Sequence, residues 1–254
     1  MKYIDIHNHL IYGVDDGAKT REDTIAMLKR AVDDGIEKMI MTPHYYEFRY
    51  DNDKALIESK KVEMINIIKE LNLPIELYFG CEVFASEKIR KQISDGHINT
   101  LNDSKYVLIE THRAKIYQMM DFSDLLYNIT IDGYIPIIAH PERYEMVQED
   151  LNIVQEWIDD GCLIQLNATS LFKKKSNSYK TAKKLLDQQL VHFIATDAHD
   201  LVHRAPVLSE AYQFVEKRYG KDYANRLFYD HPLKVIKNEV INLTPIKLSK
   251  RLLW

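Results

Sequence analysis

Two histidines stand almost at the start of the chain, in the segment DIHNHL from Asp5 to Leu10. Residues two apart on a β-strand point to the same face, so a strand over KYIDIHNHL would project His7 and His9 together. Paired imidazole nitrogens can hold one divalent metal ion. Taken alone, an H-x-H pair favours two surface or hydrogen-bonded histidines, so the rest of the chain has to decide.

The other short apolar runs are followed by residues of the same chemistry. The segments are GVDDGA after the first run, then TPH, GCE, IETH, AHPERY and TDAHD, whereas the sixth run, QLNATS, offers only Asn167. The candidate metal ligands are His7, His9, Asp16, His44, Glu82, Glu110, His140, Asp197 and His199. Gathered at one place, these groups would be costly to bury without cations. Mixed imidazole and carboxylate ligands suit Mn²⁺, Fe²⁺ or Zn²⁺, and the set exceeds what one ion needs and matches two or three.

The remaining histidines and the cysteines carry weaker signals. Surface or helix-capping positions are expected for His97, His192 and His231, while His112 and His203 stay open between surface and function. Cysteine-dependent tyrosine phosphatases need an arginine six positions after the reactive thiol. Glu87 stands six positions after Cys81, and Ala168 stands six positions after Cys162. Neither cysteine can therefore serve such a phosphate-binding loop.

The elements that would carry these residues alternate along the chain. Short apolar runs predict buried parallel strands at 3–6, 38–42, 75–80, 106–110, 135–140, 162–167 and 192–196. Amphipathic patterns predict helices at 20–35, 53–72, 119–133, 151–161, 178–189 and 205–220. Seven such alternations without a Gly/Pro/Ser-rich linker predict one α/β domain over 1–254, a closed or nearly closed barrel, with roughly 241–254 as a tail or docked helix. In a β/α barrel, the residues that follow the strands meet at one end and form the reactive site.

Bulk composition restricts the class of protein. The chain has 254 residues, a net charge of −4, 46% hydrophobic and 28% charged residues, and two cysteines. These values are typical of a globular cytoplasmic protein without a disulfide framework. The negative charge argues against a nucleic-acid partner. We expect no signal peptide and no direct membrane insertion, since no apolar run approaches the roughly 20 residues of a membrane span.

The motifs DIHNHL, DDG, TPH, GCE, AHPER and TDAH, in this order, resemble those of the PHP (polymerase and histidinol phosphatase) metalloenzymes. HNHLIYGVDDGA, MTPHY and IAHPERY are most similar to the capsule-locus protein tyrosine phosphatases of Gram-positive bacteria, the CpsB/CapC/YwqE type. The resemblance implies a distorted (β/α)₇ barrel with a trinuclear centre, usually of manganese, that hydrolyses phosphotyrosine. It also implies a phosphotyrosine protein substrate, the tyrosine-rich tail of a membrane-associated bacterial tyrosine kinase, and a role in capsule or exopolysaccharide synthesis.

The same resemblance assigns roles to single residues. It groups His7 and His9 with Glu82 and Asp197 at a first ion. Glu82 bridges to a second ion with Glu110 and His140, and a third set contains Asp16, His44 and His199. Arg143 and Arg204 match phosphate-contacting arginines, and Asp200 or His203 is the candidate proton donor to the leaving phenolate. Fe²⁺, Zn²⁺ or Mg²⁺ are possible substitutes for Mn²⁺.

Two alternatives remain open from the sequence. One is another PHP phosphoesterase, such as a histidinol-phosphate or nucleotide phosphatase, which would share the metal ligands. The other is a non-catalytic metal-binding module that docks a kinase. Turnover of phosphotyrosine peptide against histidinol phosphate separates the first alternative, and the effect of chelation on activity separates the second.

Overall fold

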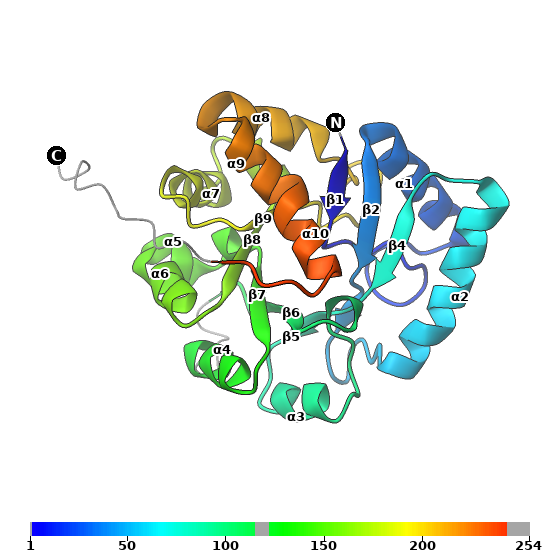
Figure 1. Ribbon diagram of the computed structural model, residues 1–254, viewed down its shortest axis with the longest axis horizontal. Helices are drawn as coiled ribbons and strands as arrows, with labels where there is room; N and C mark the ends of the chain where they lie inside the picture. Colours follow the sequence, from blue (N-terminus) through cyan, green and yellow to red (C-terminus); the bar gives the residue numbers. More distant parts are fainter. Residues whose placement is uncertain (1, 115–121, 243–254) are drawn as a thin grey trace.

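Parallel strands form the centre of the molecule, with helices around them (Figure 1). The computed structural model describes residues 2–114 and 122–242. The strands are β1 (Tyr3–Asp5), β2 (Ile36–Met41), β3 (His44–Tyr45), β4 (Glu76–Phe79), β5 (Glu82–Phe84), β6 (Tyr106–Glu110), β7 (Ile135–Ala139), β8 (Leu163–Asn167) and β9 (Phe193–Ala195). They pair in the orders β1-β2-β4 and β3-β5-β6-β7-β8-β9, and every pairing between these strands is parallel.

The two sheets are parts of one barrel wall that is interrupted twice. The breaks fall between β2 and β3 and between β4 and β5, and backbone bonds from Gly80 to Met41 (2.9 Å) and from Glu82 to Pro43 (3.1 Å) span them. The wall closes where a parallel bridge joins Asn8 to Ala198 beyond the ends of β1 and β9. If each interrupted pair is taken as one strand, the described chain forms the distorted seven-stranded barrel that the sequence predicts.

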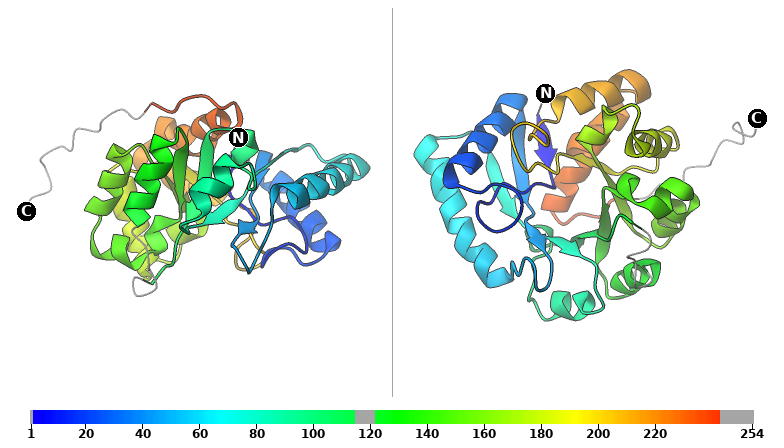
Figure 2. Two further views of the ribbon diagram at one scale, coloured as in Figure 1. Left: turned by 90° about the horizontal axis from the view of Figure 1, so that it is seen from below. Right: turned by 180° about the vertical axis from the view of Figure 1, so that it is seen from behind.

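Helices cover the outside of this wall (Figures 1 and 2). The α-helices are α1 (Arg21–Asp34), α2 (Lys54–Leu71), α3 (Ile89–Ser94), α4 (Phe122–Ile131), α5 (Glu145–Glu149), α6 (Asn152–Asp159), α7 (Asn177–Asp187), α8 (Ser209–Tyr219), α9 (Lys221–Asn225) and α10 (His231–Ile236). The six predicted helices correspond to α1, α2, α4, α6, α7 and α8, and the capping box at Thr20 and Asp23 is present. The short α3, α5, α9 and α10 were not predicted, because segments of five or six residues carry no helical period.

The barrel interior is apolar at the N-terminal ends of the strands. Its core includes Ile40, Leu108, Ile137, Leu163 and Phe193, all almost fully buried. The helix α10 and the π-helical turn η5 (Arg226–Asp230) contact β1 and β9 at this end, and Val235 and Ile241 join the same core. Of the predicted tail or docked helix at 241–254, positions 243–254 lie outside the described residues.

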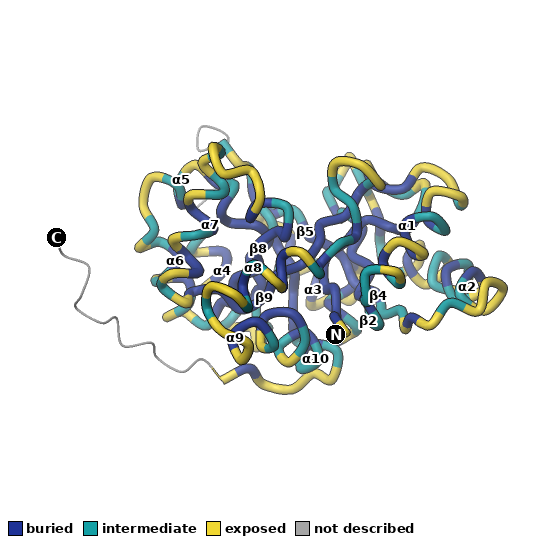
Figure 3. Tube along the Cα trace, turned by 90° about the horizontal axis from the view of Figure 1, so that it is seen from above, coloured by how far each residue is buried: buried dark blue, intermediate teal, exposed yellow. Residues whose placement is uncertain are grey.

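A second and larger apolar core lies between the strands and the surrounding helices. In Figure 3 the strands run through the buried part of the trace, whereas the exposed positions follow the outer helix faces and the connecting loops. Among the helices of residues 2–114 and 122–242, each is too short or too polar to cross a membrane.

Candidate metal centre

Along the strands, the side chains that face the barrel interior are apolar at the N-terminal end and polar at the C-terminal end. Leu108 belongs to the barrel core, and Glu110, two positions on, lies in the cluster. The same period links Phe193 and Ala195 of the core to Asp197. Since residues two apart share a face, the chemistry changes along each strand while the direction of the side chains stays the same. The polar cluster therefore lies at the C-terminal ends of the strands, as predicted.

His7 and His9 lie past the end of β1, which stops at Asp5. Strand-like pairing nevertheless continues, because the His9 amide donates to the Ala198 carbonyl and the Asp197 amide donates to the His7 carbonyl, both at 2.8 Å. The two imidazoles face one point, with their Nε2 atoms 3.3 Å apart. The expected shared orientation is present although the strand itself is shorter than predicted.

Glu82 is at the centre of the cluster and fully buried. Its Oε2 lies 3.2 Å from His7 Nε2 and 3.2 Å from His9 Nε2. It lies 3.0 Å from His44 Nδ1. Its Oε1 lies 3.0 Å from His140 Nε2. One carboxylate thus contacts four imidazoles, which is the arrangement expected of a bridging ligand.

The remaining candidates complete the cluster on two sides of Glu82. Glu110 Oε1 lies 3.1 Å from His44 Nδ1, and Asp197 Oδ1 lies 3.5 Å from the Nε2 atoms of His7 and His9. Asp16 Oδ1 lies 3.3 Å from His44 Nε2 and 3.4 Å from His199 Nε2. The structure therefore brings together all nine predicted ligands, which come from six separate regions of the chain.

The nine side chains form overlapping groups, whereas the predicted sets, one for each of three ions, have only Glu82 in common. Ligand atoms of His9, Asp16, His44 and His199 lie within 4.8 Å of one another, and so do those of His44, Glu82 and Glu110. His9 therefore approaches the third set as well as the first. His44 turns one ring nitrogen toward Glu82 and the other toward Asp16. Chain folding, not motif order, determines these neighbours.

Two of the predicted ligands hold unusual backbone conformations. His140 has φ 38° and Asp197 has φ 49°, both in the left-handed region that non-glycine residues rarely adopt. Each stands just beyond the end of a strand, where a change of chain direction turns the side chain into the cluster. Such strain persists where surrounding structure enforces it, and it is concentrated at functional sites.

A further shell of side chains fixes the direction of the imidazoles. Asp15 Oδ2 accepts from His9 Nδ1 at 2.7 Å and from the His44 amide at 3.0 Å. Gln165 Oε1 lies 2.9 Å from His7 Nδ1 and also accepts from the His140 amide at 3.3 Å, so this His7 nitrogen is the donor. In both His7 and His9, Nδ1 takes part in a hydrogen bond and Nε2 faces Glu82. Hydrogen bonds of this kind orient metal-ligating histidines.

Sequence reasoning did not identify Gln165, and it proposed no role for Asp15. Gln165 Nε2 donates to Asn167 Oδ1 at 3.0 Å, and Asn167 Nδ2 donates to Asp197 Oδ2 at 2.6 Å. A continuous chain of hydrogen bonds thus joins His7 to Asp197. The one signal available was the period-two spacing of Gln165 and Asn167 on an otherwise apolar strand.

The electrostatics of the cluster favour bound cations. Burial by itself lowers the pKa of His7, but the charges of Glu82 and Asp197 outweigh it and raise that pKa to about 9. Burial raises the pKa of Glu82, and the adjacent His7 and His44 reverse this and hold it well below its usual value. The protein therefore stabilises ionised carboxylates and demands positive charge beside them, and divalent ions supply such charge.

Orphaned polar atoms are a test of whether metal ions fit. Among the described side chains, buried Glu82 Oε2 and His199 Nε2 make no hydrogen bond despite the charged atoms around them. A buried carboxylate oxygen or ring nitrogen without a hydrogen bond is costly unless a positive charge lies beside it. The donor set of imidazole and carboxylate atoms fits Mn²⁺, Fe²⁺ or Zn²⁺.

Two arginines adjoin the cluster. Arg143 Nη1 and Arg204 Nη1 donate to Asp197 Oδ2 at 2.9 Å and 3.1 Å. Asp200 Oδ1 instead accepts from the amides of Val202, His203 and Arg204. Burial tends to raise the pKa of Asp200, but these hydrogen bonds outweigh it and lower the pKa, which favours the ionised form. This arrangement favours a role in holding the loop that carries Arg204, and proton donation by Asp200 stays a prediction.

The two cysteines and the histidines outside the metal centre lie in different environments. Burial raises the pKa of Cys81 and of Cys162 to about 12, so both thiols are protonated at neutral pH. The expectation of a surface position is wrong for His192, which is buried and accepts a hydrogen bond from the Ile164 amide at 3.0 Å. His97 and His203 are exposed.

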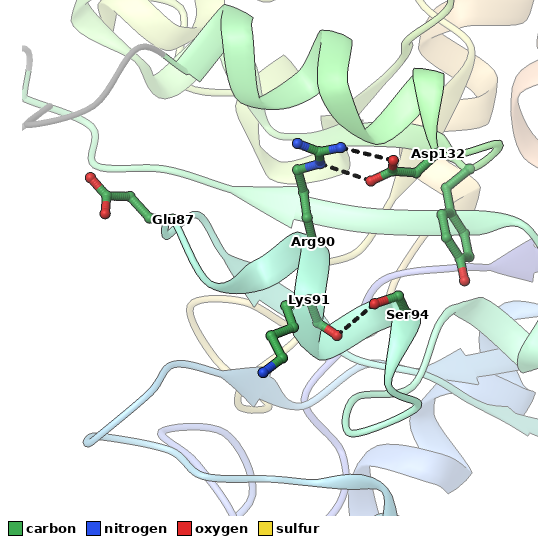
Figure 4. A pocket seen from close by; sticks show the side chains of 6 residues that line it. Glu87, Arg90, Lys91, Ser94 and Asp132 are labelled. Atoms are coloured by element: carbon green, nitrogen blue, oxygen red, sulfur yellow. Dashed lines mark hydrogen bonds and ion pairs between the residues drawn. The ribbon is translucent and has the colours of Figure 1, made fainter.

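A separate pocket of about 650 Å³ lies between α3 and the turn from α4 to β7 (Figure 4). Arg90 and Asp132 line it and pair through two hydrogen bonds of 2.8 Å each. None of the metal-centre residues lines this pocket. Its lining residues include no histidine and no cysteine, so it does not repeat the chemistry of the metal centre.

The chain is similar over almost its whole length to proteins of one family. The family model described as "Capsular polysaccharide synthesis, CpsB/CapC" matches residues 3–237. The chain is 34% identical to the tyrosine-protein phosphatase CpsB of Streptococcus pneumoniae, over 94% of this chain and 100% of that one. It is also 34% identical to the putative tyrosine-protein phosphatase CapC of Staphylococcus aureus, over 98% and 94%.

Solved structures extend the likeness to three dimensions. The fold matches a structure from a study of Bacillus subtilis YwqE and S. pneumoniae CpsB, described as unique metal-dependent tyrosine phosphatases, with a TM-score of 0.88 and 28% identity over 95% of this chain and 97% of that one. A phosphotriesterase homology protein of Escherichia coli shares the fold alone, with a TM-score of 0.56 and 14% identity over 91% and 97%. On the match of almost its whole length, this chain belongs to the CpsB/CapC family.

Proposed function

We propose that this protein is a metal-dependent protein tyrosine phosphatase. The observation that carries the proposal is the position of Glu82 Oε2, which makes no hydrogen bond although three imidazole nitrogens lie 3.0–3.2 Å away. Such a group requires cations, and the guanidinium groups of Arg143 and Arg204 contact Asp197 of the same cluster. Cations next to paired arginines suit a phosphate monoester.

We propose two or three Mn²⁺ ions as the resident cofactor. The ligands would be His7, His9, Asp16, His44, Glu82, Glu110, His140, Asp197 and His199, with Glu82 as a bridge. When bound, the ions supply positive charge for the phosphoryl oxygens and lower the pKa of water toward neutrality. Mg²⁺ prefers oxygen ligands and is a poorer match to five imidazoles, whereas Fe²⁺ and Zn²⁺ are acceptable substitutes.

The chain itself would bind and orient the phosphoryl group. In this structure Arg143 and Arg204 share Asp197 Oδ2 as an acceptor, so each guanidinium has further N–H groups to offer. They would hold the phosphoryl oxygens as negative charge grows on them in the transition state. A phenolate leaves readily compared with an alkoxide, so a strong general acid is unnecessary, and Asp200 or His203 is the candidate if one acts.

The substrate that we propose is phosphotyrosine in the tyrosine-rich tail of a membrane-associated bacterial tyrosine kinase. The relatives are named as tyrosine-protein phosphatases, and the matching family model is described by capsular polysaccharide synthesis. Control of capsule or exopolysaccharide synthesis is the corresponding role. We place the protein in the cytoplasm, where such a tail would be dephosphorylated.

Side-by-side turnover of a phosphotyrosine peptide and histidinol phosphate, by Mn²⁺-loaded protein, tests the proposal. We expect a higher kcat/KM on the peptide, and equal or better turnover of histidinol phosphate would favour the alternative phosphoesterase. Exhaustive chelation with EDTA should abolish turnover and Mn²⁺ should restore it. Protein that binds Mn²⁺ but hydrolyses neither ester would instead be a metal-binding module.

A further inference from the structure

Three neighbouring strand ends carry an aromatic residue two positions after a metal-centre residue. The pairs are His44 and Tyr46, Glu82 and Phe84, and Glu110 and His112. Two residues along a strand advance the chain by about 6 to 7 Å and restore the same side-chain direction. The aromatic side chains therefore follow the metal-centre residues outward from the barrel.

These aromatic rings contact each other. Tyr46 and Phe84 are stacked, with centroids 4.2 Å apart and an interplanar angle of 11°. Phe84 meets His112 edge to face at 4.7 Å. Phe84 is also the register partner of Glu110 across β5 and β6. We name Tyr46, Phe84 and His112 the aromatic rim.

The backbone holds the rim in place at β3. Tyr46 and Tyr50 exchange two backbone hydrogen bonds of 2.9 Å and 2.8 Å, which close a tight loop. Within this loop the Tyr50 ring stacks on His44, with centroids 5.7 Å apart and an interplanar angle of 12°. Aromatic surface thus begins at the metal centre itself and continues to the rim.

The rim residues are half-buried. Tyr46 and Phe84 belong to neither of the two apolar cores of the described residues. Stacked aromatic surface that stabilises no core and lies beside a polar centre is typical of a site that holds a ligand ring. The arginine side chains lie on another side of the metal centre. Arg143 and Arg204 approach it from the segments after β7 and β9.

We propose that the aromatic rim receives the phenyl ring of phosphotyrosine and selects aryl over alkyl phosphate esters. This inference rests on the proposed function and names the part of the substrate that the rim recognises. In an aryl phosphate a single oxygen separates phosphorus from the ring. A phosphoryl group held at the metal centre by Arg143 and Arg204 therefore leaves its ring at the next layer outward, where Phe84 lies.

Binding of two non-hydrolysable probes tests the rim without a leaving group. Phenylphosphonate and methylphosphonate share the phosphoryl group and differ in the ring, so calorimetric titration of Mn²⁺-loaded protein measures the contribution of the ring directly. We expect the parent to bind phenylphosphonate about tenfold more tightly. Phe84→Ala and Tyr46→Ala should remove most of this preference, leave methylphosphonate affinity and manganese content unchanged, and raise the KM of a phosphotyrosine peptide more than they lower kcat.

Phe48→Ala is the matched control, because Phe48 is a 91% exposed aromatic at the tip of the same loop and outside the rim. It should retain the full preference, and Phe84→Tyr should retain most of it. Equal loss of both probes in Phe84→Ala, or no loss of either, would overturn the inference. If the parent fails to hydrolyse phosphotyrosine but shows the rim-dependent preference, the proposed function fails and the recognition of aryl rings stands.

Discussion

Arg143 donates a hydrogen bond to Asp197 at 2.9 Å, although the two residues are 54 positions apart in the chain. Arg143 Nη1 binds Oδ2, while Asp197 Oδ1 faces the imidazoles of His7 and His9 at 3.5 Å. One carboxylate therefore joins the proposed phosphate-binding arginine to the proposed metal centre. Arg143 is not itself one of the proposed ligands, so its replacement tests whether phosphate binding can be lost while metal binding is kept.

Arg143→Ala should keep its manganese but lose on the order of 10²-fold or more in kcat/KM, or about 3 kcal/mol of transition-state stabilisation. Arg143→Lys should recover part of this, because an ammonium supplies charge without the planar fork. Inorganic phosphate should inhibit the alanine variant less than the parent. Metal analysis and kinetics on the same preparations provide the measurement.

Arg90→Ala is the control for this experiment, since Arg90 is paired with Asp132 in the separate pocket and should leave kcat/KM unchanged. Loss of manganese in Arg143→Ala would show that Arg143 supports the ligand shell through Asp197. Retention of both manganese and activity would remove Arg143 from the proposed site.

Replacing the cysteines should leave catalysis intact. Burial keeps the pKa of Cys81 and Cys162 near 12, so neither thiol supplies a nucleophile at neutral pH. Cys81→Ser and Cys162→Ser should retain most of the kcat/KM on a phosphotyrosine peptide and remain fully sensitive to EDTA. An inactive but folded Cys162→Ser, judged by circular dichroism, would argue for a thiol mechanism.

Gly17 sets the position of His9 by close approach. A Cβ at this position would lie 2.1 Å from the His9 carbonyl oxygen and 2.5 Å from the His9 Cβ. Gly17→Ala should therefore displace His9, cost about 1–3 kcal/mol of unfolding free energy, and reduce the bound manganese. Denaturant unfolding and metal analysis measure the two effects. Gly133→Ala is the comparison, because its Cβ would meet no atom within 4 Å and only its positive φ opposes the change. Normal manganese binding in Gly17→Ala would contradict the role given to this contact.

His192 should make stability depend on pH. Burial, with the adjacent His231 charge, lowers its pKa from 6.5 to about 3. Between these values the unfolded chain binds a proton that the folded chain does not, so stability rises with pH by up to about 1.4 kcal/mol per unit. This contribution is present above pH 6.5 and is lost as pH falls toward 3.

His192→Gln should flatten the fall in unfolding free energy between pH 6.5 and 5, measured by urea unfolding of EDTA-treated protein. His97→Gln is the control, since His97 is exposed and its replacement should leave the slope unchanged. An unchanged slope in His192→Gln would show that the buried imidazole does not control this dependence.

The barrel and the types of residue at its polar end can be predicted from local patterns along the chain. Short, continuous apolar runs predict buried strands, and the residue type that ends each run, from His44 to Asp197, is a local property of the chain. The end at which these residues meet follows from parallel strand direction alone. Capping at Thr20 and the helix break at Gly35 are equally local.

Which groups contact each other depends on the folded arrangement of the whole barrel. Gln165 orients His7 across 158 positions of sequence, and no pattern near either residue indicates the pairing. The placement of His44 between Glu82 and Asp16, and the burial of His192, likewise depend on how the barrel closes. Hydrogen bonds and ion pairs act over a few ångströms in space, whereas sequence patterns report only on neighbours along one strand or helix, so these contacts exist only once the wall has closed between Asn8 and Ala198.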